Sequence, residues 1–200
     1  MLHPNTELQT INPRVGCGVF ATADIPAGTI MYAKDAMEII VREEDLLYRD
    51  KKYREHIEKY SYTEADGSKV LSWDLAKYVN HACDSNTLST GYGFEIAVRD
   101  IAKGEQVTDD YGMLNIEQVM SCECGSRHCR KMIGINDYFH FREDWDRKVR
   151  AALSCLHSVQ QPLLMYLGGE TRALLDGYLN GTDNYRSVGE LERCVVQDVA

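Results

Sequence analysis

The sequence has no long hydrophobic run and no excess of positive charge. No apolar segment follows Met1, and no stretch approaches the roughly 20 apolar residues of a membrane helix, so we expect an intracellular protein, nuclear or cytoplasmic, without a membrane partner. The triplet Asn-Gly-Thr at Asn180 matches a glycosylation sequon, which we interpret as chance because no secretory signal precedes it. The net charge of −9 argues against a phosphate-binding surface and predicts no direct nucleic-acid binding. This acidity suits a basic partner such as a Lys-rich peptide, and it equally fits a role in solubility alone.

The sequence also lacks the widely spread cysteines of a disulfide-stapled secreted domain. Three of its seven cysteines crowd into the pattern Cys122-x-Cys124-x4-Cys129. Thiolates on one loop with a bend at Gly125 can converge on a zinc ion at about 2.3 Å. A fourth position would be filled by water in a catalytic site, or by a distant ligand in a structural one, for which Cys83 is the candidate. Reduced surface cysteines are the alternative interpretation.

The first 134 residues have the pattern of short strands. Residues 15–33 predict two paired strands around a turn that contains Asp24, Pro26 and Gly28. A similar β-turn-β unit recurs over residues 94–108, where apolar and polar residues alternate as in a strand with one buried face. A further short strand is predicted over residues 69–73.

Helical spacing dominates the rest of the chain. One helix is predicted earlier, over residues 43–60, and a second over residues 143–167, interrupted by Pro162. Ser187, with Glu190 three residues later, predicts the start of a last helix over residues 188–199. No low-complexity linker divides the chain, so we expect the helices to pack on the strand-rich part.

Three short motifs precede the cysteine cluster. They are Gly16-Cys17-Gly18 followed by Val-Phe-Ala, YVNHACDSN (residues 78–86), and GEQVTDDYG (residues 104–112). With the cluster, these motifs resemble a SET-domain protein lysine methyltransferase with a cysteine-rich post-SET segment, over about residues 14–136. A bare Gly-x-Gly has little weight, but four motifs in this order are a specific signal. The layout is most similar to that of small stand-alone SET proteins.

The resemblance implies an α+β, β-rich SET-domain fold, with small curved sheets around a pseudoknot. Residues 1–119 would form the SET domain with an insert helix at about 43–60, residues 120–136 the post-SET zinc-binding segment, and residues 137–200 a C-terminal helical extension packed on the SET domain. S-adenosylmethionine would lie on one face, and the target lysine would enter a narrow channel from the other. Packing, substrate recognition and homodimerisation are open roles for the C-terminal helices.

The resemblance also assigns the cofactor-binding residues. Gly16 and Gly18 would let the backbone approach the cofactor, because no Cβ stands in the way. Cys17 would contribute backbone contacts, and Asn80 and His81 would hydrogen-bond the amino-acid and adenine ends. Taken without the resemblance, the glycines fit a tight turn and the Asn-His pair fits a buried cap.

Tyr111 is the residue to which the resemblance assigns catalysis. Methyl transfer is an in-line displacement, so positioning and electrostatics dominate, and a phenol hydroxyl can orient the lysine amine and the methyl group. A desolvated channel beside a sulfonium lowers the pKa of the lysine, so no dedicated base is required. Tyr60 and Tyr62 are candidate channel walls, or equally core residues. Asp109 stands where the family has Phe or Tyr, a position that influences how many methyl groups are added.

The implied metal is one structural Zn²⁺, which would hold the late loop beside the cofactor. Its ligands would be Cys83, Cys122, Cys124 and Cys129. The expected substrate is a lysine-containing protein or peptide, with histones first by family analogy. Two interpretations from other classes stay open. One is a catalytically weak SET-like module that binds a basic peptide, indicated by Asp109, and the other is a zinc-stapled structural protein without a cofactor.

Overall fold

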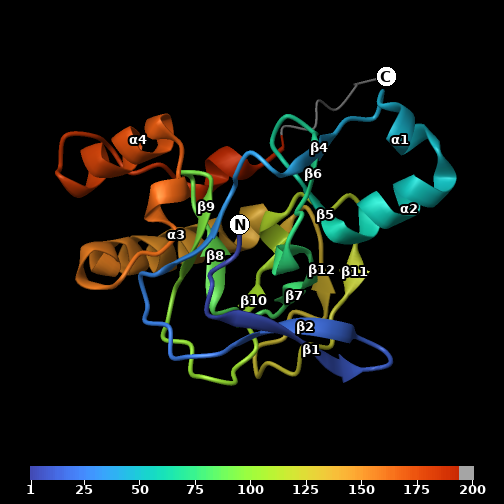
Figure 1. Cartoon of the computed structure of the whole chain (residues 1–200), viewed down its shortest axis with the longest axis horizontal. Helices are drawn as coiled ribbons and strands as arrows, with labels where there is room; N and C mark the ends of the chain where they lie inside the picture. The colour runs from blue at the N-terminus through green and yellow to red at the C-terminus, as the bar shows by residue number, and fades with distance from the viewer. Residues whose placement is uncertain (194–200) are drawn as a thin grey trace.

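The computed structural model describes residues 1–193. Short strands are the commonest elements in the first two thirds of the chain, and helices dominate the last third (Figure 1). The strands are β1 (Thr6–Asn12), β2 (Gly16–Ala21), β3 (Ile30–Ala33), β4 (Ile39–Val41), β5 (Ser61–Thr63), β6 (Lys69–Leu71), β7 (Asn80–His81), β8 (Thr87–Ser89), β9 (Phe94–Ala97), β10 (Thr108–Asp109), β11 (Met120–Ser121) and β12 (Met132–Ile133). The α-helices are α1 (Leu46–Arg49), α2 (Lys51–Tyr60), α3 (Asp137–Cys155) and α4 (Gly169–Leu179).

The largest core lies between the antiparallel sheet β3-β9-β8 and the C-terminal helices, which stand beside that sheet in Figure 1. Tyr138, Trp145, Val149 and Leu153 recur at helical spacing, so α3 presents one apolar face to the sheet. From the sheet, Phe94 and other buried residues complete this core. Burying each large apolar side chain contributes about 1.5–3 kcal/mol, which is why the helices are held on the strand-rich part.

The prediction of paired strands within residues 15–33 is wrong. Strand β2 pairs with β1, in the register Thr6 opposite Ala21, and β3 pairs with β9. No sequence pattern predicts β1, because this strand is largely exposed and its residues, TELQTIN, lack apolar alternation. A single pair of strands was predicted where the structure has two separate pairings.

The turns that link these strands bind each other. The backbones of Ile25 and Ile101 exchange two hydrogen bonds of 2.9 Å. The Asp24 carboxylate accepts a hydrogen bond from the Lys103 amide at 2.8 Å, and the Asp100 carboxylate accepts one from the Ala27 amide at 2.8 Å. The two similar sequence units are therefore a reciprocal pair of turns at one end of the second core, which includes Val19, Met31 and Val107 among its members.

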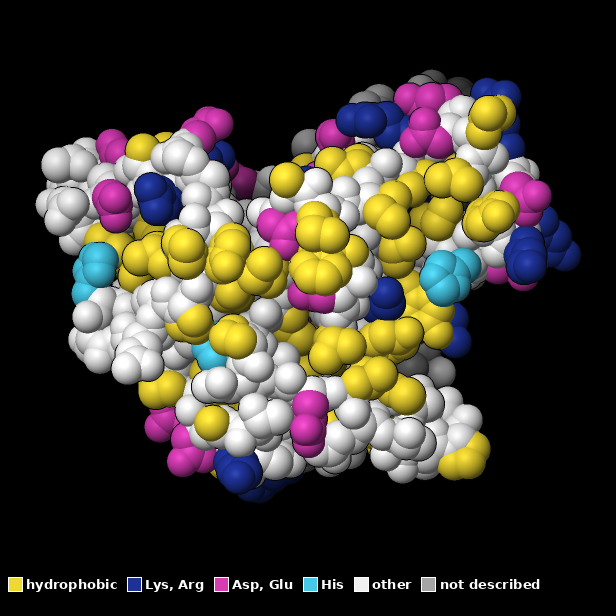
Figure 2. All heavy atoms as spheres, viewed as in Figure 1, with side chains coloured by type: hydrophobic (Ala, Val, Ile, Leu, Met, Phe, Trp, Pro, Cys, Tyr) yellow, Lys and Arg dark blue, Asp and Glu magenta, His cyan; other side chains and the backbone are white. Residues whose placement is uncertain are grey.

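The insert between β4 and β6 differs in detail from the predicted single helix over residues 43–60. Asp50 adopts an extended conformation, ends α1, and caps α2 by accepting a hydrogen bond from the Lys52 amide at 2.9 Å. Helix α2 then leads into the small sheet β4-β6-β5. Exposed apolar side chains gather over this part of the molecule, as Figure 2 shows at the upper right. They include Ile39, Leu46 and Tyr53.

The C-terminal third also departs from its prediction. Helix α3 begins six residues before the predicted start at 143, and it ends at Cys155, well before Pro162. Two short 3-10 turns, Leu156–Ser158 and Leu164–Tyr166, replace the rest of the predicted helix. Ser187 does cap by accepting a hydrogen bond from the Gly189 amide, but over a 3-10 turn at Val188–Leu191, and residues 194–200 of the predicted last helix lie outside the described residues. No helix within residues 1–193 combines the length and apolarity needed to cross a membrane.

Candidate functional site

A short parallel strand pair organises the site. In β7 and β10, Asn80 lies opposite Thr108 and His81 opposite Asp109, and the Ala82 amide donates to the Asp109 carbonyl at 3.1 Å. Tyr111 follows two residues after the end of β10, so the Asn-His segment and the tyrosine segment lie together. Successive side chains of a strand point to opposite faces, and Asn80 and His81 accordingly contact different parts of the chain.

Asn80 contacts the glycine-rich strand β2. Its side-chain Nδ2 donates a hydrogen bond to the Cys17 carbonyl at 3.0 Å. A Cβ atom placed on Gly18 would come within 2.8 Å of that Nδ2 and within 2.6 Å of the Gln106 side-chain nitrogen. A side chain at position 18 would therefore have to displace the ends of these side chains, including the Nδ2 that binds the Cys17 carbonyl.

His81 faces the tyrosine segment and the cysteines. Its Nδ1 accepts a hydrogen bond from the Tyr111 amide at 3.1 Å. Burial, opposed by the nearby Asp110 carboxylate, lowers the pKa of His81 to about 4, so the ring is neutral at pH 7. Because Nδ1 accepts, the single ring proton belongs on Nε2, which lies 3.3 Å from the Cys83 sulfur and donates to it. Both ring nitrogens are thus engaged within the protein, which leaves only the main chain of His81 for a cofactor.

The cysteines form a candidate metal centre. The donor atoms of His81, Cys83, Cys122 and Cys124 all lie within 4.8 Å of one another. The sulfur of Cys122 lies 3.8 Å from that of Cys83 and 3.7 Å from that of Cys129. A tetrahedron with Zn–S bonds of 2.3 Å has an edge of about 3.8 Å, so these spacings fit zinc. This group of four donors contains His81 and not Cys129, the fourth ligand that the resemblance implies, although the Cys129 sulfur lies 3.7 Å from that of Cys122.

The loop that carries three of these cysteines is held by backbone contacts. Strands β11 and β12 pair as Met120 opposite Ile133 and Ser121 opposite Met132, and they enclose the cysteine segment. The Cys83 amide donates to the Cys124 sulfur at 3.4 Å, and the Arg130 amide donates to the Cys83 sulfur at 3.3 Å. Burial alone would raise the pKa of Cys124, but amide donors and neighbouring thiols outweigh it and lower the pKa to about 7. Burial raises the pKa of Cys83 and of Cys122, so among these three thiols Cys124 is the one nearest to the thiolate form, which binds a metal.

Arg130 joins this loop to the tyrosine segment and to α3. Its guanidinium pairs with the Asp110 carboxylate and lies 3.3 Å from that of Asp137 at the start of α3. It also stacks over the Phe141 ring, 4.7 Å from the centroid. Asp110 further accepts a hydrogen bond from the Trp145 indole at 3.0 Å. The residue next to Tyr111 is therefore fixed from both the metal loop and the helical extension.

Tyr111 lines a cavity of about 270 Å³. Its hydroxyl donates to the Val79 carbonyl at 2.8 Å, so the oxygen lone pairs stay available. Burial, then the charges of Asp109 and Glu95, raise the pKa of Tyr111 above its usual range, so the phenol stays neutral. Tyr60 and Tyr62 line the same cavity, whereas the glycines of β2 and the side chains of Asn80 and His81 do not. Among the predicted site residues, the tyrosines and Asp109 thus gather at the cavity, and His81 is joined to it by the hydrogen bond from the Tyr111 amide.

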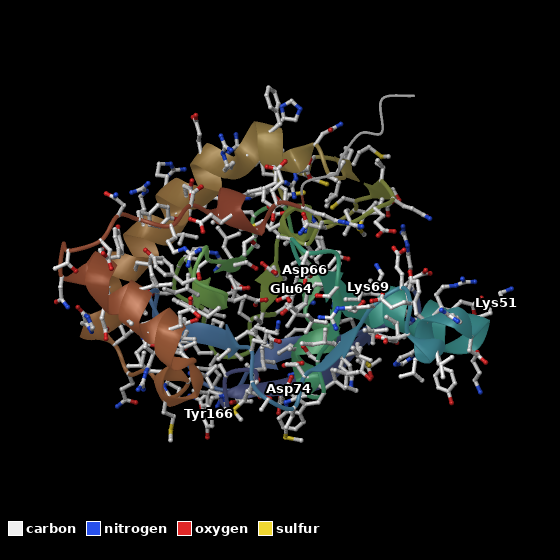
Figure 3. The ribbon with its side chains drawn as sticks, turned by 90° about the horizontal axis from the view of Figure 1, so that it is seen from above. Lys51, Glu64, Asp66, Lys69, Asp74 and Tyr166 are labelled. Carbon is white, nitrogen blue, oxygen red and sulfur yellow. The ribbon has the colours of Figure 1, made fainter. Side chains whose placement is uncertain are left out.

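A second cavity of about 290 Å³ adjoins the first. The two share the lining residues Tyr32, Tyr62, Glu95 and Leu114. Glu64 and Asp66 line only the second cavity, and in Figure 3 they lie together near the middle of the molecule, far from Lys51 at the end of α2. The lining that the two cavities share thus combines two tyrosine rings with the carboxylate of Glu95, and Glu64 is paired with Lys34 at 2.8 Å.

Sequence reasoning missed several residues of the site. Glu95 gave no signal because it occupies the polar phase of an alternating strand, where a solvated side chain is the ordinary expectation. Arg130 and Trp145 gave none because their contacts with Asp110 join segments far apart in the chain. In the sequence, only the position of Asp110 directly before Tyr111 indicates that Asp110 and its partners belong to the site.

Comparison with known proteins identifies the domain. The family model of the SET domain matches residues 16–112. Among curated proteins, the chain is 30% identical over 130 residues to the histone-lysine N-methyltransferase trithorax of Drosophila virilis, which covers 59% of the chain and 3% of that protein. It is 27% identical over 133 residues to the histone-lysine N-methyltransferase Set2 of Drosophila melanogaster, a match that covers 60% of the chain and 6% of that protein. It is 31% identical over 67 residues to the histone-lysine N-methyltransferase ASHH3 of Arabidopsis thaliana, a match that covers 30% of the chain and 18% of that protein. The chain thus spans a small part of each of these relatives.

The chain is also similar to a solved structure of KRYPTONITE in complex with mCHG DNA and SAH, with a TM-score of 0.43 and 18% sequence identity. That similarity covers 64% of this chain and 29% of the KRYPTONITE chain. The family match encloses β2, the β7–β10 pair and Tyr111. Residues 16–112 are a SET domain, and the chain is similar there to histone-lysine N-methyltransferases. The cysteine cluster after it fits a post-SET segment.

Proposed function

We propose that the chain is an S-adenosylmethionine-dependent protein-lysine N-methyltransferase that acts on a histone or another basic protein. The observation that carries this proposal is the placement of Tyr111. Its neutral hydroxyl is oriented by the Val79 carbonyl, inside a cavity with aromatic walls, beside the β7–β10 pair. The similarity to histone-lysine N-methyltransferases over 130 residues supports the substrate class.

The residues of β2 and β7 fit a methyl donor with an amino-acid and a nucleoside end. Gly16, Cys17 and Gly18 would offer main-chain groups, with close approach at Gly18. Asn80 would hold that strand through the Cys17 carbonyl, and its Oδ1 has no hydrogen-bond partner within residues 1–193. His81 would contribute its main chain. When bound, S-adenosylmethionine supplies an electrophilic methyl group on a sulfonium.

The protein's part in the reaction is to orient the amine and exclude water. The phenol oxygen of Tyr111 has free lone pairs that can accept a hydrogen bond from the lysine amine. The walls formed by Tyr60 and Tyr62 would desolvate the amine, which favours the neutral form that carries a lone pair. Asp66 of the adjoining cavity would attract a basic peptide, whereas Glu64 is paired with Lys34 at 2.8 Å.

The metal centre would be structural. Four thiols would saturate a tetrahedral zinc ion, leaving no position for substrate or water. Through Cys83, His81 and the Tyr111 amide, the metal loop is connected by hydrogen bonds to the catalytic segment. We therefore assign the ion the role of holding this segment in place.

The test measures cofactor binding and methyl transfer separately. Calorimetric titration of the zinc-loaded chain with S-adenosylmethionine should show binding, and mass spectrometry should show methyl groups on core histones or on proteins of a cell lysate. Tyr111→Phe removes only the hydroxyl that donates to Val79, so cofactor binding should persist while transfer falls by at least tenfold. Tyr53→Phe, on the exposed face of α2, is the matched control.

Asp109 specifically favours a second candidate function, a module that binds a basic peptide without efficient turnover. Its carboxylate in the cavity could hold a lysine ammonium without activating it. Transfer by the native chain no faster than by Tyr111→Phe, together with cofactor binding, would favour that module. Absence of cofactor binding would exclude both, leaving a zinc-stapled structural protein.

A further inference from the structure

The last described residues return from the C-terminal helices to the second cavity. We call residues 187–193 the strap. The strap begins on α3, where the Ser187 hydroxyl and the Val188 amide donate hydrogen bonds to the Asp146 carboxylate at 2.6 and 2.9 Å. It ends beside the second cavity, which Leu191 lines. The C-terminal extension therefore supplies one wall of a cavity that adjoins the proposed active site.

Asn115 joins the strap to the segment that carries Tyr111. Asn115 is 2% exposed, and its Nδ2 donates hydrogen bonds to the Leu191 carbonyl at 2.8 Å and to the Thr63 carbonyl at 2.9 Å. Its Oδ1 accepts a hydrogen bond from the Arg193 amide at 2.9 Å. One buried side chain thus connects three segments that lie far apart in the sequence.

The backbone of Asn115 suits this role. Its φ is 51°, in the left-handed region, which asparagine adopts more readily than most residues other than glycine. Glycine would fit the same backbone, but it would lose all three side-chain hydrogen bonds. The contribution of the side chain can therefore be separated from that of the backbone conformation.

The contacts of Asn115 hold two walls of the second cavity in place relative to each other. Thr63 follows Tyr62, whose ring lines both cavities, and the Thr63 amide donates to the Leu114 carbonyl at 3.3 Å. Leu114 lines both cavities as well. Asn115 therefore fixes the Leu191 wall against the walls that continue into the first cavity.

The continuity and the charge of the second cavity indicate what it binds. Because the two cavities share four lining residues, a ligand that fills one of them lies against the other. Asp66 and Glu95 line the second cavity, as does Glu64, which is already paired with Lys34. No lysine or arginine within residues 1–193 lines it. This charge is complementary to the basic peptide of the proposed function.

We propose that the second cavity is part of the peptide-binding site, and that Asn115 is a positioning residue that holds its Leu191 wall in place. This inference rests on the proposed function and deepens it, because it assigns the C-terminal extension to substrate binding. The residue next to the target lysine occupies the second cavity and packs against Leu191. Asn115 acts through the strap, so it determines the affinity for the peptide and not the binding of the cofactor.

The test compares two variants that change this wall in different ways. Asn115→Gly keeps the left-handed backbone and removes the three hydrogen bonds, whereas Leu191→Trp keeps the hydrogen bonds and fills the cavity. Binding of fluorescein-labelled histone H3 and H4 tail peptides to the zinc-loaded full chain is measured by fluorescence anisotropy, and S-adenosylmethionine binding by calorimetry. Each variant should bind the peptides at least fivefold more weakly, with a cofactor dissociation constant within twofold of the native value. In transfer assays KM for the peptides should rise at least fivefold, while kcat changes by less than twofold.

Leu179→Ala is the control for a merely structural effect. Leu179, at the end of α4, packs against the same core as Leu191 but does not line the second cavity. This variant should lower the melting temperature and leave the affinities for peptide and cofactor unchanged. All binding assays are run at a temperature at which the melting curves show every variant to be folded.

Three outcomes would contradict the proposal in different ways. Unchanged peptide affinity in both Asn115→Gly and Leu191→Trp would overturn the role of the second cavity. An equal loss of peptide affinity in Leu179→Ala would show that the effect is one of stability alone. Either result would leave the proposed methyltransferase intact. A native chain that binds neither S-adenosylmethionine nor the peptides would overturn the proposed function and the positioning role together.

Discussion

We expect the replacement of Arg130 by Met to destabilise the protein strongly, although Arg130 does not line the Tyr111 cavity. The Arg130 side chain is 10% exposed, and its two partners Asp110 and Asp137 are 3% and 11% exposed. Removing the cation leaves two buried carboxylates without their main counter-charge. Breaking a buried pair in this way costs about 3–5 kcal/mol. The contact with Phe141 adds a smaller loss of about 1 kcal/mol.

The expected loss is therefore a third or more of a typical folding free energy of roughly 5–15 kcal/mol. Urea denaturation of the zinc-loaded chain, followed by tryptophan fluorescence, measures it, since Trp145 donates to Asp110 and reports on the same network. For a chain of this size the melting temperature should fall by roughly 8–24 °C. Arg130→Lys keeps the charge but not the two-pronged geometry, so its loss should be intermediate.

Arg127→Met is the control, because Arg127 lies on the same loop, is exposed, and has no ion pair in the described chain. Its free energy of unfolding should change by less than about 0.5 kcal/mol. A loss below about 1 kcal/mol for Arg130→Met, or one equal to that of Arg127→Met, would show that Arg130 does not hold the metal loop, Asp110 and α3 together.

Three other predictions concern the site. Gly18→Ala places a Cβ 2.8 Å from the Asn80 side chain, so we expect a loss of about 1–3 kcal/mol in denaturation and at least tenfold weaker S-adenosylmethionine binding by calorimetry. Glu95→Gln removes a group whose pKa rises from 4.5 in the unfolded chain to about 7 in the folded chain, so the native protein loses stability as the pH rises through this window. The variant should therefore be more stable than the native protein by up to about 3 kcal/mol at pH 8 and by nearly nothing at pH 4. Thermal melts across pH measure this difference. Removal of zinc by a strong chelator releases Cys83 and so the ring of His81, and should weaken cofactor binding; unchanged affinity would refute this coupling.

The sequence predicted what depends on local pattern and on ordered motifs. The motif order identified the SET domain, and the cysteine spacing indicated the metal centre, because both are written in short segments. Strand β1 was missed since an exposed polar strand has no alternation, and its pairing with β2 is a contact that no local pattern encodes. The boundary of α3 was predicted too late because its first turns bury Asp137, a residue that normally indicates solvent.

The site shows the same division. Tyr111, Asp109 and the cysteines could be found by their motifs, whereas Glu95 acquires its position only when β9 is laid between β3 and β8. Its polar phase in an alternating strand predicts exposure, and burial at the cavity is decided by strands distant in sequence. The ring nitrogens of His81 are another such case, since their partners are fixed by the β7–β10 pairing.

That pairing also limits how this region can vary. With Asn80 opposite Thr108 and His81 opposite Asp109, the two side chains lie on opposite sides of β7. Asn80 contacts the glycine-rich strand β2, and His81 contacts Cys83 and the Tyr111 segment. A deletion or insertion of a single residue in either segment would exchange the sides, sending the imidazole toward the glycines and the amide toward the thiols. Length changes should therefore be tolerated in the intervening turns, and a shift of one position within these four residues should break the Asn80–Cys17 hydrogen bond and the His81–Cys83 contact at once.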